Sequence, residues 1–171
     1  MKKIGLLSDT HAYLDPAILD FFEDCDEIWH AGDIGNKEIT DQLAAFKPLK
    51  AVYGNIDGKP LNWEFPEFIR MDIEGLQVLM IHIAGPIGKY TPRLRELLAE
   101  KRPDILVCGH SHICKVAKDD KFNLIYINPG ACGRHGFHHM RTILRMILQD
   151  GKIAGMELIE LGKRSAIDRN T

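Results

Sequence analysis

The chain has 171 residues, of which 45% are apolar and 27% are charged, and its formal net charge is -2. This length fits one domain, spanning residues 1–171, with a buried core of its own. The nearly balanced charge argues against a dedicated nucleic-acid binder and against recruitment to anionic membranes, because neither kind of surface would attract this protein.

The sequence contains four cysteines that form no CxxC pair: Cys25, Cys108, Cys114 and Cys132. Cys25 and Cys108 lie in apolar segments, which favours buried thiols in a reducing compartment over the alternative of a zinc–thiolate site. The apolar run near the N-terminus ends at Ser8, so it is too short for a signal peptide, and no segment is long enough to cross a bilayer. We therefore expect a cytoplasmic protein that makes no membrane contact.

Hydrophobic patterning in the first third of the chain predicts alternating strands and helices. The expected elements are a strand at 4–7, a helix whose apolar positions run from Leu14 to Cys25, a strand at 27–31, a helix around 39–46 and a strand at 49–53. Asp15 is the expected N-cap of the first helix, with Pro16 as its first residue, and the second helix should end before Pro48. This order predicts parallel strands joined by right-handed crossovers.

The rest of the chain alternates between hairpins and one more helix. The expected elements are a turn-like stretch from Pro60 to Pro66, a hairpin of 68–73 and 76–82, a helix opened by Thr91-Pro92, a strand at 104–108, a hairpin of 113–117 and 123–127, a loop from 128 to about 139, and a hairpin of 141–148 and 153–161. A polar tail should follow from about residue 162. We predict an α/β protein in which two packed sheets are flanked by helices.

Five apolar runs end in residues that can bind a metal: Asp9 with His11, Asp33, Asn55, His82, and His110 with His112. Ligands in open α/β sheets bind at the carboxyl ends of the strands, so these side chains can converge on one site. The alternative is ordinary turn chemistry, which is favoured for Asp9, Asp33 or Asn55 taken singly. A coincidence at all five strand ends is the weaker explanation.

The residue types indicate the chemistry of such a site. Carboxylate, amide and imidazole ligands together suit two divalent transition-metal ions, with Mn the preferred choice and Ni, Fe, Co or Zn as alternatives. Two such ions can hold a bridging hydroxide for in-line attack on a phosphoester, so no protein nucleophile is needed. The sequence agrees with this, because it has no GxSxG motif of the kind that carries a nucleophilic serine. We expect the catalytic core to include Asp33, Asn55 and Asp57.

The ordered motifs resemble those of the calcineurin-like metallophosphoesterase superfamily, and in particular its small YfcE-like phosphodiesterase branch. The resemblance covers about residues 3–133 and rests on Asp9-x-His11, Gly32-Asp33, Gly54-Asn55-x-Asp57, His82 and Gly109-His110-x-His112. It implies a four-layer α/β/β/α sandwich of two mixed sheets with a dinuclear site. By motif position, one ion would be held by Asp9, His11, Asp33 and His112, and the other by Asp33, Asn55, His82 and His110.

Two positions depart from the family pattern. Many members follow the motif Asn with a His that assists the leaving group or contacts the phosphate, whereas this chain has Ile56 there. Isoleucine cannot donate a proton, so we expect activated leaving groups to be hydrolysed best. Ile83-Ala84 follows His82 where related sequences often have Gly, and we expect this change to reshape the pocket.

The sequence allows two roles for several other polar residues. Asp57 either hydrogen-bonds the site from behind the ligands or is a plain turn residue. Arg134 and His135 either clamp a phosphate or form a solvated loop pair, and they are the candidate substrate contacts. His30 lies inside a strand and is expected to be a satisfied core or interface histidine, while His138-His139 should start the last hairpin and face water.

The leading hypothesis is a phosphodiesterase that acts on small phosphoesters and can associate with copies of itself. The alternative is a non-catalytic protein-binding scaffold of the same fold, similar to a retromer subunit. A scaffold has no need to keep His11 and the three later histidines, so their presence favours the enzyme. A nuclease acting on long nucleic acid would need a basic groove, which this charge does not indicate.

Overall fold

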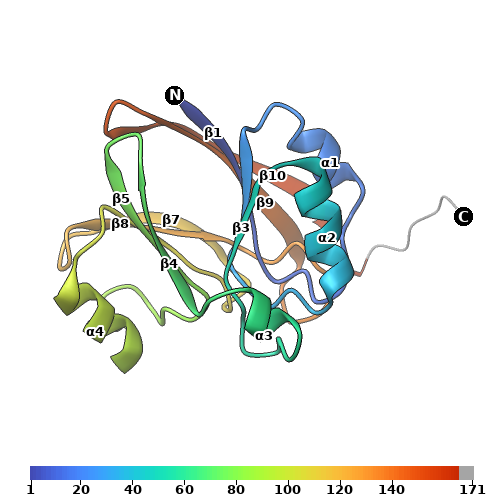
Figure 1. The fold of residues 1–171 in the computed structure, drawn as a ribbon, viewed down its shortest axis with the longest axis horizontal. Coiled ribbons are helices and arrows are strands. Elements are labelled where there is room, and N and C mark those ends of the chain that lie inside the picture. The colour runs from blue at the N-terminus through green and yellow to red at the C-terminus, as the bar shows by residue number, and fades with distance from the viewer. Residues whose placement is uncertain (166–171) are drawn as a thin grey trace, which may run out of the picture.

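The computed structural model describes residues 1–165. Two five-stranded sheets pack face to face, and helices cover their outer faces (Figure 1). The strand order is β10-β9-β1-β2-β3 in the first sheet and β4-β5-β6-β8-β7 in the second. Both sheets contain parallel and antiparallel pairs, so the predicted four-layer sandwich of two mixed sheets is confirmed.

The first sheet is built around three parallel strands, as the alternating pattern predicted. Its strands are β1 (Lys2–Leu7), β2 (Glu27–His30), β3 (Leu49–Ala51), β9 (Met140–Gln149) and β10 (Lys152–Lys163). Two helices, α1 (Ala17–Phe21) and α2 (Lys37–Phe46), lie on its outer face (Figure 1). Ile18 of α1 and Leu43 of α2 share a buried cluster with Leu7 of β1, which fixes this layer.

The second sheet carries one helix on its outer face. Its strands are β4 (Phe68–Ile73), β5 (Leu76–Ile81), β6 (Ile105–Val107), β7 (Cys114–Asp119) and β8 (Leu124–Pro129), and the helix is α4 (Pro92–Glu100). Thr91 caps α4 by accepting a hydrogen bond from the backbone N–H of Leu94, as the Thr-Pro pair predicted. Leu94 and Leu97 pack into the same buried cluster as Leu79 of β5.

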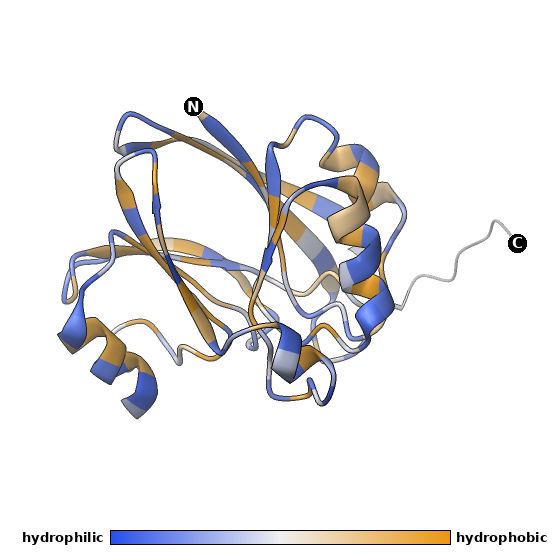
Figure 2. Cartoon of the chain, viewed as in Figure 1, coloured by the Kyte–Doolittle hydropathy of each residue, from blue (hydrophilic) through white to orange (hydrophobic). Residues whose placement is uncertain are grey.

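The main core lies between the two sheets. Apolar residues line the strands of both sheets along this layer (Figure 2). Ile4 and Leu6 of β1 meet Met80 of β5 and Val107 of β6 there, and each is essentially inaccessible to solvent. Burial of this many apolar side chains is the dominant stabilising contribution in a domain of this size.

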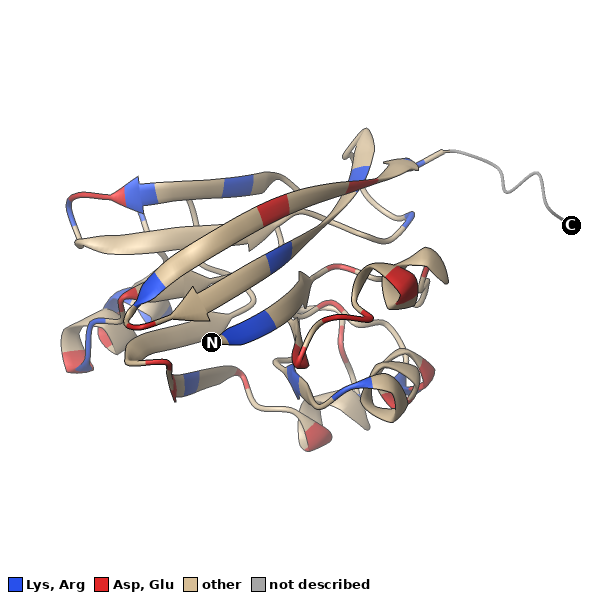
Figure 3. Cartoon of the chain, turned by 90° about the horizontal axis from the view of Figure 1, so that it is seen from above, with Lys and Arg blue, Asp and Glu red and all other residues tan. Residues whose placement is uncertain are grey.

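Lys and Arg are interspersed with Asp and Glu along the helices and the outer strands (Figure 3). This distribution agrees with the small net charge of -2. Within residues 1–165, none of the helices is both long enough and apolar enough to span a membrane.

The first helix is shorter than predicted. It begins at Ala17, with Pro16 at the N-cap position, and ends at Phe21 rather than near Cys25. Asp15 still satisfies the backbone N–H of Ala17 through its side chain. The chain turns after Phe21 because the ring of Phe22 packs directly over Gly5 of β1, where any added Cβ would lie 2.6 Å from the ring.

Two other expectations are corrected. The stretch from Pro60 to Pro66 contains a short helix, α3 (Leu61–Glu64), which is anchored by the buried Leu61 side chain. The polar tail does not begin at Gly162, because β10 continues to Lys163 and pairs there with β9. Residues 166–171 of that predicted tail lie outside the described part of the chain.

Candidate metal centre

The loops that follow β1 and β2 run side by side beyond the carboxyl ends of the parallel strands. The backbone N–H of Asp9 donates to Gly32 O at 2.9 Å, and that of His11 donates to Asp33 O at 3.0 Å. The loop after β8 joins them through Gly133 N–H, which donates to Asp9 O at 3.1 Å. Three distant segments of sequence are thereby locked together at one edge of the sandwich.

Five of the expected ligands have left-handed backbone conformations that side chains rarely adopt: Asp9, His11, Asp33, His110 and His112, with φ between 45° and 68°. Such conformations cost free energy and persist only where the surrounding structure enforces them, and they concentrate at functional sites. The strained residues follow three different strands. The strain is therefore a property of this edge of the sandwich as a whole and indicates a functional site there.

Glycines leave room for the two acidic side chains. A Cβ added at Gly54 would lie 2.1 Å from Asp33 Oδ1, and one added at Gly109 would lie 2.7 Å from Asp9 Oδ2. Real side chains cannot approach this closely, so both positions require glycine. The glycines in the Gly-Asn and Gly-His motifs therefore serve to admit the carboxylates of Asp33 and Asp9.

The side chains form two adjacent groups of potential metal donors. The first comprises Asp9, His11 and His112, and the second comprises Asp33, His82 and His110. Within each group, one donor atom from every residue lies within 4.8 Å of the others. The ligand sets implied by motif order contain these two groups and add Asp33 to the first and Asn55 to the second.

The two groups adjoin through their acidic members. His11 Nε2 of the first group lies 3.5 Å from Asp33 Oδ2, and His82 Nε2 of the second lies 4.0 Å from Asp9 Oδ1. Asp33 is also 3.2 Å from His82 Nε2 through its other oxygen, Oδ1. The Asp33 carboxylate thus has one oxygen facing each group, which is the arrangement that a bridging ligand requires.

Hydrogen bonds on the far side of two imidazoles set their tautomers. His82 Nδ1 lies 2.7 Å from Ala31 O, so Nδ1 carries the proton and Nε2 presents its lone pair to the site. His138 Nε2 lies 2.9 Å from Gly133 O and must donate to it, which leaves His138 Nδ1 as an acceptor. His112 Nδ1, 3.2 Å away, is then the donor, and His112 Nε2 presents a lone pair to the site.

The donor atoms face one another without ordinary hydrogen bonds. Asp9 Oδ1, His11 Nε2 and His82 Nε2 are buried and make no hydrogen bond to the described residues. When His112 is neutral in this tautomer, its Nε2 lone pair faces Asp9 Oδ1 at 3.1 Å. Buried polar atoms are almost always satisfied, so such facing acceptors need a proton or a metal cation between them. The donor set therefore fits a pair of divalent ions.

Charge interactions shift the protonation of both groups. Burial disfavours ionisation of Asp9, but the imidazoles of His11 and His112 outweigh it and hold its pKa below the ordinary value. The pKa of Asp33 is also lowered, because His82 beside it overcomes the effect of burial. Burial lowers the pKa of His110, whereas at His82 the neighbouring carboxylates of Asp33 and Asp9 outweigh burial and raise the pKa. Metal ligands require anionic carboxylates and neutral imidazoles, so a bound cation would have to displace the proton from His82.

A cleft of about 440 Å³ opens above these groups. Its lining includes His11, Asp33, Asn55, His110 and His112, so the expected amide ligand lies at the same opening as the carboxylates and imidazoles. Ile56 also lines the cleft with an exposed side chain, and its backbone N–H donates to Asp33 Oδ1 at 3.1 Å. Ile56 thus orients the acidic side chain through its backbone while its side chain faces the cleft.

Asp57 lies behind the donor groups. Its carboxylate accepts hydrogen bonds from the backbone N–H groups of Ile34, Gly35 and Gly54 at 2.8–3.0 Å. These bonds tie the loop after β2 to the loop after β3. These contacts favour the interpretation in which Asp57 hydrogen-bonds the site from behind the ligands over that of a plain turn residue. Asp57 positions the loops that carry Asp33 and Asn55.

The two candidate substrate contacts are placed differently. The His135 ring packs against His11, with ring centroids 4.9 Å apart, and lines the cleft. The guanidinium of Arg134 lies over the ring of Tyr13 at 4.4 Å from its centroid, and Arg134 is not among the described residues that line the cleft. His135 alone of this pair therefore reaches the opening.

Two further histidines test the sequence interpretation. His30 is fully buried, with Nε2 3.0 Å from Thr10 Oγ1 and Nδ1 accepting from Gly32 N–H, so the prediction of a satisfied core histidine is confirmed. The prediction that His138 faces water is wrong, because it is partly buried against His112. Its position depends on the path of the loop after β8, which no local sequence signal specifies.

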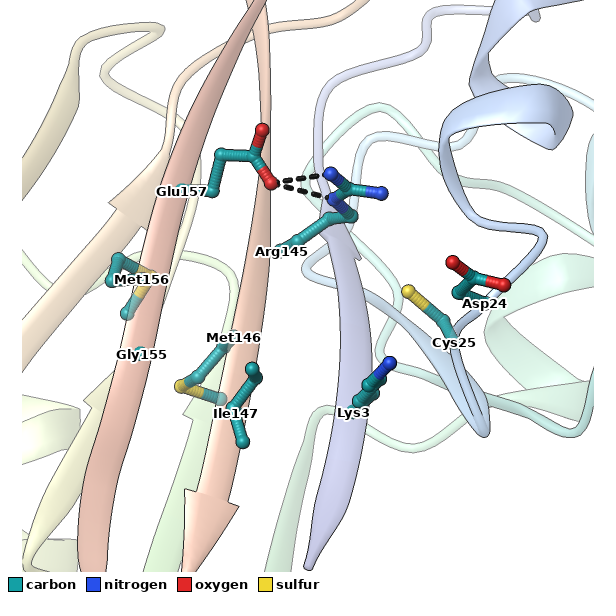
Figure 4. Close-up of a pocket in the computed structure, with 9 residues that line it drawn as sticks. All are labelled: Lys3, Asp24, Cys25, Arg145, Met146, Ile147, Gly155, Met156 and Glu157. Carbon is teal, nitrogen blue, oxygen red and sulfur yellow. Dashed lines mark hydrogen bonds and ion pairs between the residues drawn. The ribbon is translucent and has the colours of Figure 1, made fainter.

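A separate cavity of about 320 Å³ lies beside β1, β9 and β10, away from the donor groups (Figure 4). Two of the charged residues at its edge form an ion pair, in which Arg145 Nε donates to Glu157 Oε2 at 2.8 Å. Burial raises the pKa of the Cys25 thiol at its floor, which keeps the thiol protonated. Among the described residues that line this cavity, none has a buried side-chain nitrogen or oxygen without a hydrogen bond, in contrast to the metal centre.

Comparison with known proteins agrees with this geometry. A family model described as the calcineurin-like phosphoesterase superfamily domain matches residues 1–151. A probable metallophosphoesterase of Methanocaldococcus jannaschii is 35% identical over 135 residues, covering 75% of this chain and 67% of the relative. A phosphodiesterase of the same organism is 28% identical over 147 residues, covering 76% of this chain and 84% of the relative.

Solved structures share the fold at lower identity. An archaeal phosphodiesterase has a TM-score of 0.73 at 24% identity and covers 93% of this chain and 99% of its own. Vps29 from Entamoeba histolytica, in complex with Zn²⁺, has a TM-score of 0.71 at 15% identity and covers 95% of this chain and 99% of its own. Because the family model matches most of the chain, the chain belongs to the calcineurin-like phosphoesterase superfamily.

Proposed function

We propose that this protein is a metal-dependent phosphodiesterase that hydrolyses small phosphodiesters. The observation that carries the proposal is the convergence of two donor groups in which three buried atoms, Asp9 Oδ1, His11 Nε2 and His82 Nε2, lack hydrogen bonds to the described residues. The name of the phosphodiesterase relative supports the reaction class. The described residues that line the cleft include no Lys or Arg, which favours small substrates over long nucleic acid.

The proposed ligand sets follow the two groups. Asp9, His11, Asp33 and His112 would hold one ion, and Asp33, Asn55, His82 and His110 would hold the other. Mn is the preferred ion, with Ni, Fe, Co and Zn as alternatives, since imidazole and carboxylate ligands suit this series. When bound, such ions lower the pKa of a water molecule and offset negative charge on the phosphoryl oxygens.

The protein groups have their own tasks in this reaction. Hydrolysis of a diester consumes one water: its oxygen bonds to phosphorus, one P–O ester bond breaks, and a proton ends on the released alcohol. Asp57 keeps Asp33 and Asn55 in place by bonding both of their loops. Ile56 offers no proton to the departing oxygen, so the leaving group must depart largely unaided.

The test is hydrolysis of nitrophenyl phosphate mono- and diesters after chelation and re-addition of Mn, Ni, Zn or Mg. We expect turnover to disappear on chelation and to return with a transition metal, with the diester preferred. Asp33→Ala should abolish turnover, because it removes the carboxylate shared by both groups, while far-UV circular dichroism stays unchanged. Retention of activity in Asp33→Ala would contradict the proposal.

A second candidate is a non-catalytic scaffold that binds another protein. Exposed apolar side chains around the cleft favour it, since such patches often mark protein interfaces. Against it stands the complete set of donors, whose strained backbones a scaffold would have no need to maintain. A protein that binds metals stoichiometrically yet hydrolyses none of the esters would favour this candidate.

A further inference from the structure

The rim of the metal cleft is unusually apolar. Within residues 1–165, eight large apolar side chains are exposed, and three of them line this one cleft: Ile56, Ile113 and Phe137. Phe137 is completely exposed. Isolated exposed apolar residues are common, but several around one concave opening mark a surface that contacts a ligand.

The cleft continues into a second cavity of about 500 Å³, which we call the apolar annex. It is lined by the loop from Ile83 to Ile87, by Gly109 to Ser111, and by Ile113, Lys115 and Tyr126. His110, Ser111 and Ile113 line both cavities, so the annex opens directly beside the second donor group. Its volume lies within the range of small-molecule sites.

Charge limits what the annex can accept. Lys115 is the one Lys or Arg among the described residues that line the cleft and the annex. A polyphosphate or a nucleic-acid strand needs several such cations to balance its charge. An uncharged, apolar group needs none and gains free energy by leaving water.

From this placement we propose that the substrate is a phosphoester with an apolar or aromatic ester arm, which lies in the apolar annex while its phosphate lies at the two donor groups. The inference rests on the proposed function and adds its substrate class. Ile113 is then a specificity-determining residue, because it stands between the two cavities and its side chain is 65% exposed in the absence of substrate.

The experiment compares phenylphosphonate with methylphosphonate as ligands of the Mn-loaded protein, by isothermal titration calorimetry. The two probes share their charged group and differ only in one arm, so their affinity ratio measures the annex alone. We expect phenylphosphonate to bind at least about tenfold more tightly, since small apolar differences in such pockets have effects of this size. Metal uptake is measured first in the same instrument.

Two variants of Ile113 test whether this residue, between the cleft and the annex, sets the preference. Ile113→Ser and Ile113→Asp should both reduce the preference for phenylphosphonate severalfold, and neither should unfold the protein, because the side chain is largely exposed. Val116→Ser is the matched control: Val116 is also an exposed apolar residue, lies in β7 three positions away, and does not line the annex. It should keep the wild-type ratio.

The outcomes separate this inference from the proposed function. Equal affinities in the wild type, no measurable binding of either probe, or an unchanged ratio in both Ile113 variants would overturn the annex assignment. Phenylphosphonate preference without hydrolysis of any ester would support the annex and refute the phosphodiesterase. Hydrolysis of the esters without a preference for phenylphosphonate would support the phosphodiesterase and refute the annex assignment.

Discussion

His138 Nδ1 lies 3.2 Å from Nδ1 of His112, on the side of that imidazole opposite the metal donors. His138 donates through Nε2 to Gly133 O, so a chain of hydrogen bonds runs from the backbone through the His138 ring to His112 Nδ1, and His112 Nε2 is left to face the donor group. Groups that orient a ligand from behind fix its tautomer and its ring plane. His138 is therefore a positioning residue for the first donor group.

Replacing His138 should weaken metal binding. We expect His138→Ala to lower the affinity of the first donor group for its metal ion about 10- to 100-fold, because His112 loses the partner that keeps its Nε2 unprotonated. Calorimetric titration with Mn measures this directly. His139→Ala is the control, since that neighbour is exposed. Equal affinities in the two variants would show that the His112–His138 contact does not orient the ligand.

Gly54 offers a test of the space around Asp33. A methyl group at Gly54 would lie 2.1 Å from Asp33 Oδ1 and 2.2 Å from Asp33 N, so Gly54→Ala must displace this carboxylate. We expect kcat for an activated diester to fall about 100-fold, because displacements near 1 Å have effects of this size at reacting groups.

The chain provides a matched control four residues later. A Cβ at Gly58 would meet nothing within 4 Å, and Gly58 has no left-handed backbone. Gly58→Ala should therefore leave kcat and the thermal midpoint close to the wild type. A comparable loss of activity in both variants would mean that the loop is sensitive to any substitution and that the contact with Asp33 is not the cause.

Much of this centre was predictable because strand ends carry simple signals. The strands end at Leu7, His30, Ala51, Ile81 and Val107, and the polar residues that follow them lie at one edge because the strands are parallel. The periodicity also predicted both sheets. Candidate ligands that follow a single strand, such as Asp9-x-His11, could therefore be proposed from the sequence alone.

Other features depend on how loops cross in space. The role of Asp57 stayed open in the sequence because its three backbone partners include Ile34 and Gly35, more than twenty positions away. The contact of His138 depends on a loop with left-handed glycines at Gly130 and Gly136, whose path cannot be derived from local propensity. Helix α3 was missed because the flanking prolines favour a turn.

Ile56 should set the preference for leaving groups. Its side chain lines the cleft and cannot protonate a departing oxygen, so aryl diesters with acidic phenols should be hydrolysed far faster than alkyl diesters. Ile56→His should raise kcat for a poorly activated alkyl diester about 100-fold and change the aryl reaction much less. Ile56→Val is the control. Equal turnover of aryl and alkyl diesters by the wild type would contradict this role.

His30 should make stability depend on pH. Complete burial disfavours its charged form and lowers its pKa from 6.5 to about 4. Between these values the unfolded chain binds a proton that the folded protein excludes. The contribution of neutral His30 is thus fully present above about pH 6.5, is lost as the pH falls towards 4, and amounts to about 3 kcal/mol.

Urea unfolding of the wild type and His30→Gln across this pH range measures that contribution. Glutamine does not titrate, so the variant should lose less free energy of unfolding than the wild type between pH 7 and pH 4. His30→Gln should be less stable than the wild type at neutral pH, because it loses the hydrogen bonds of His30 to Thr10 and Gly32. This loss lowers the whole curve of unfolding free energy against pH without changing its slope. The slope carries the test, and parallel curves for the two proteins would show that His30 is protonated in the folded state as readily as in the unfolded chain.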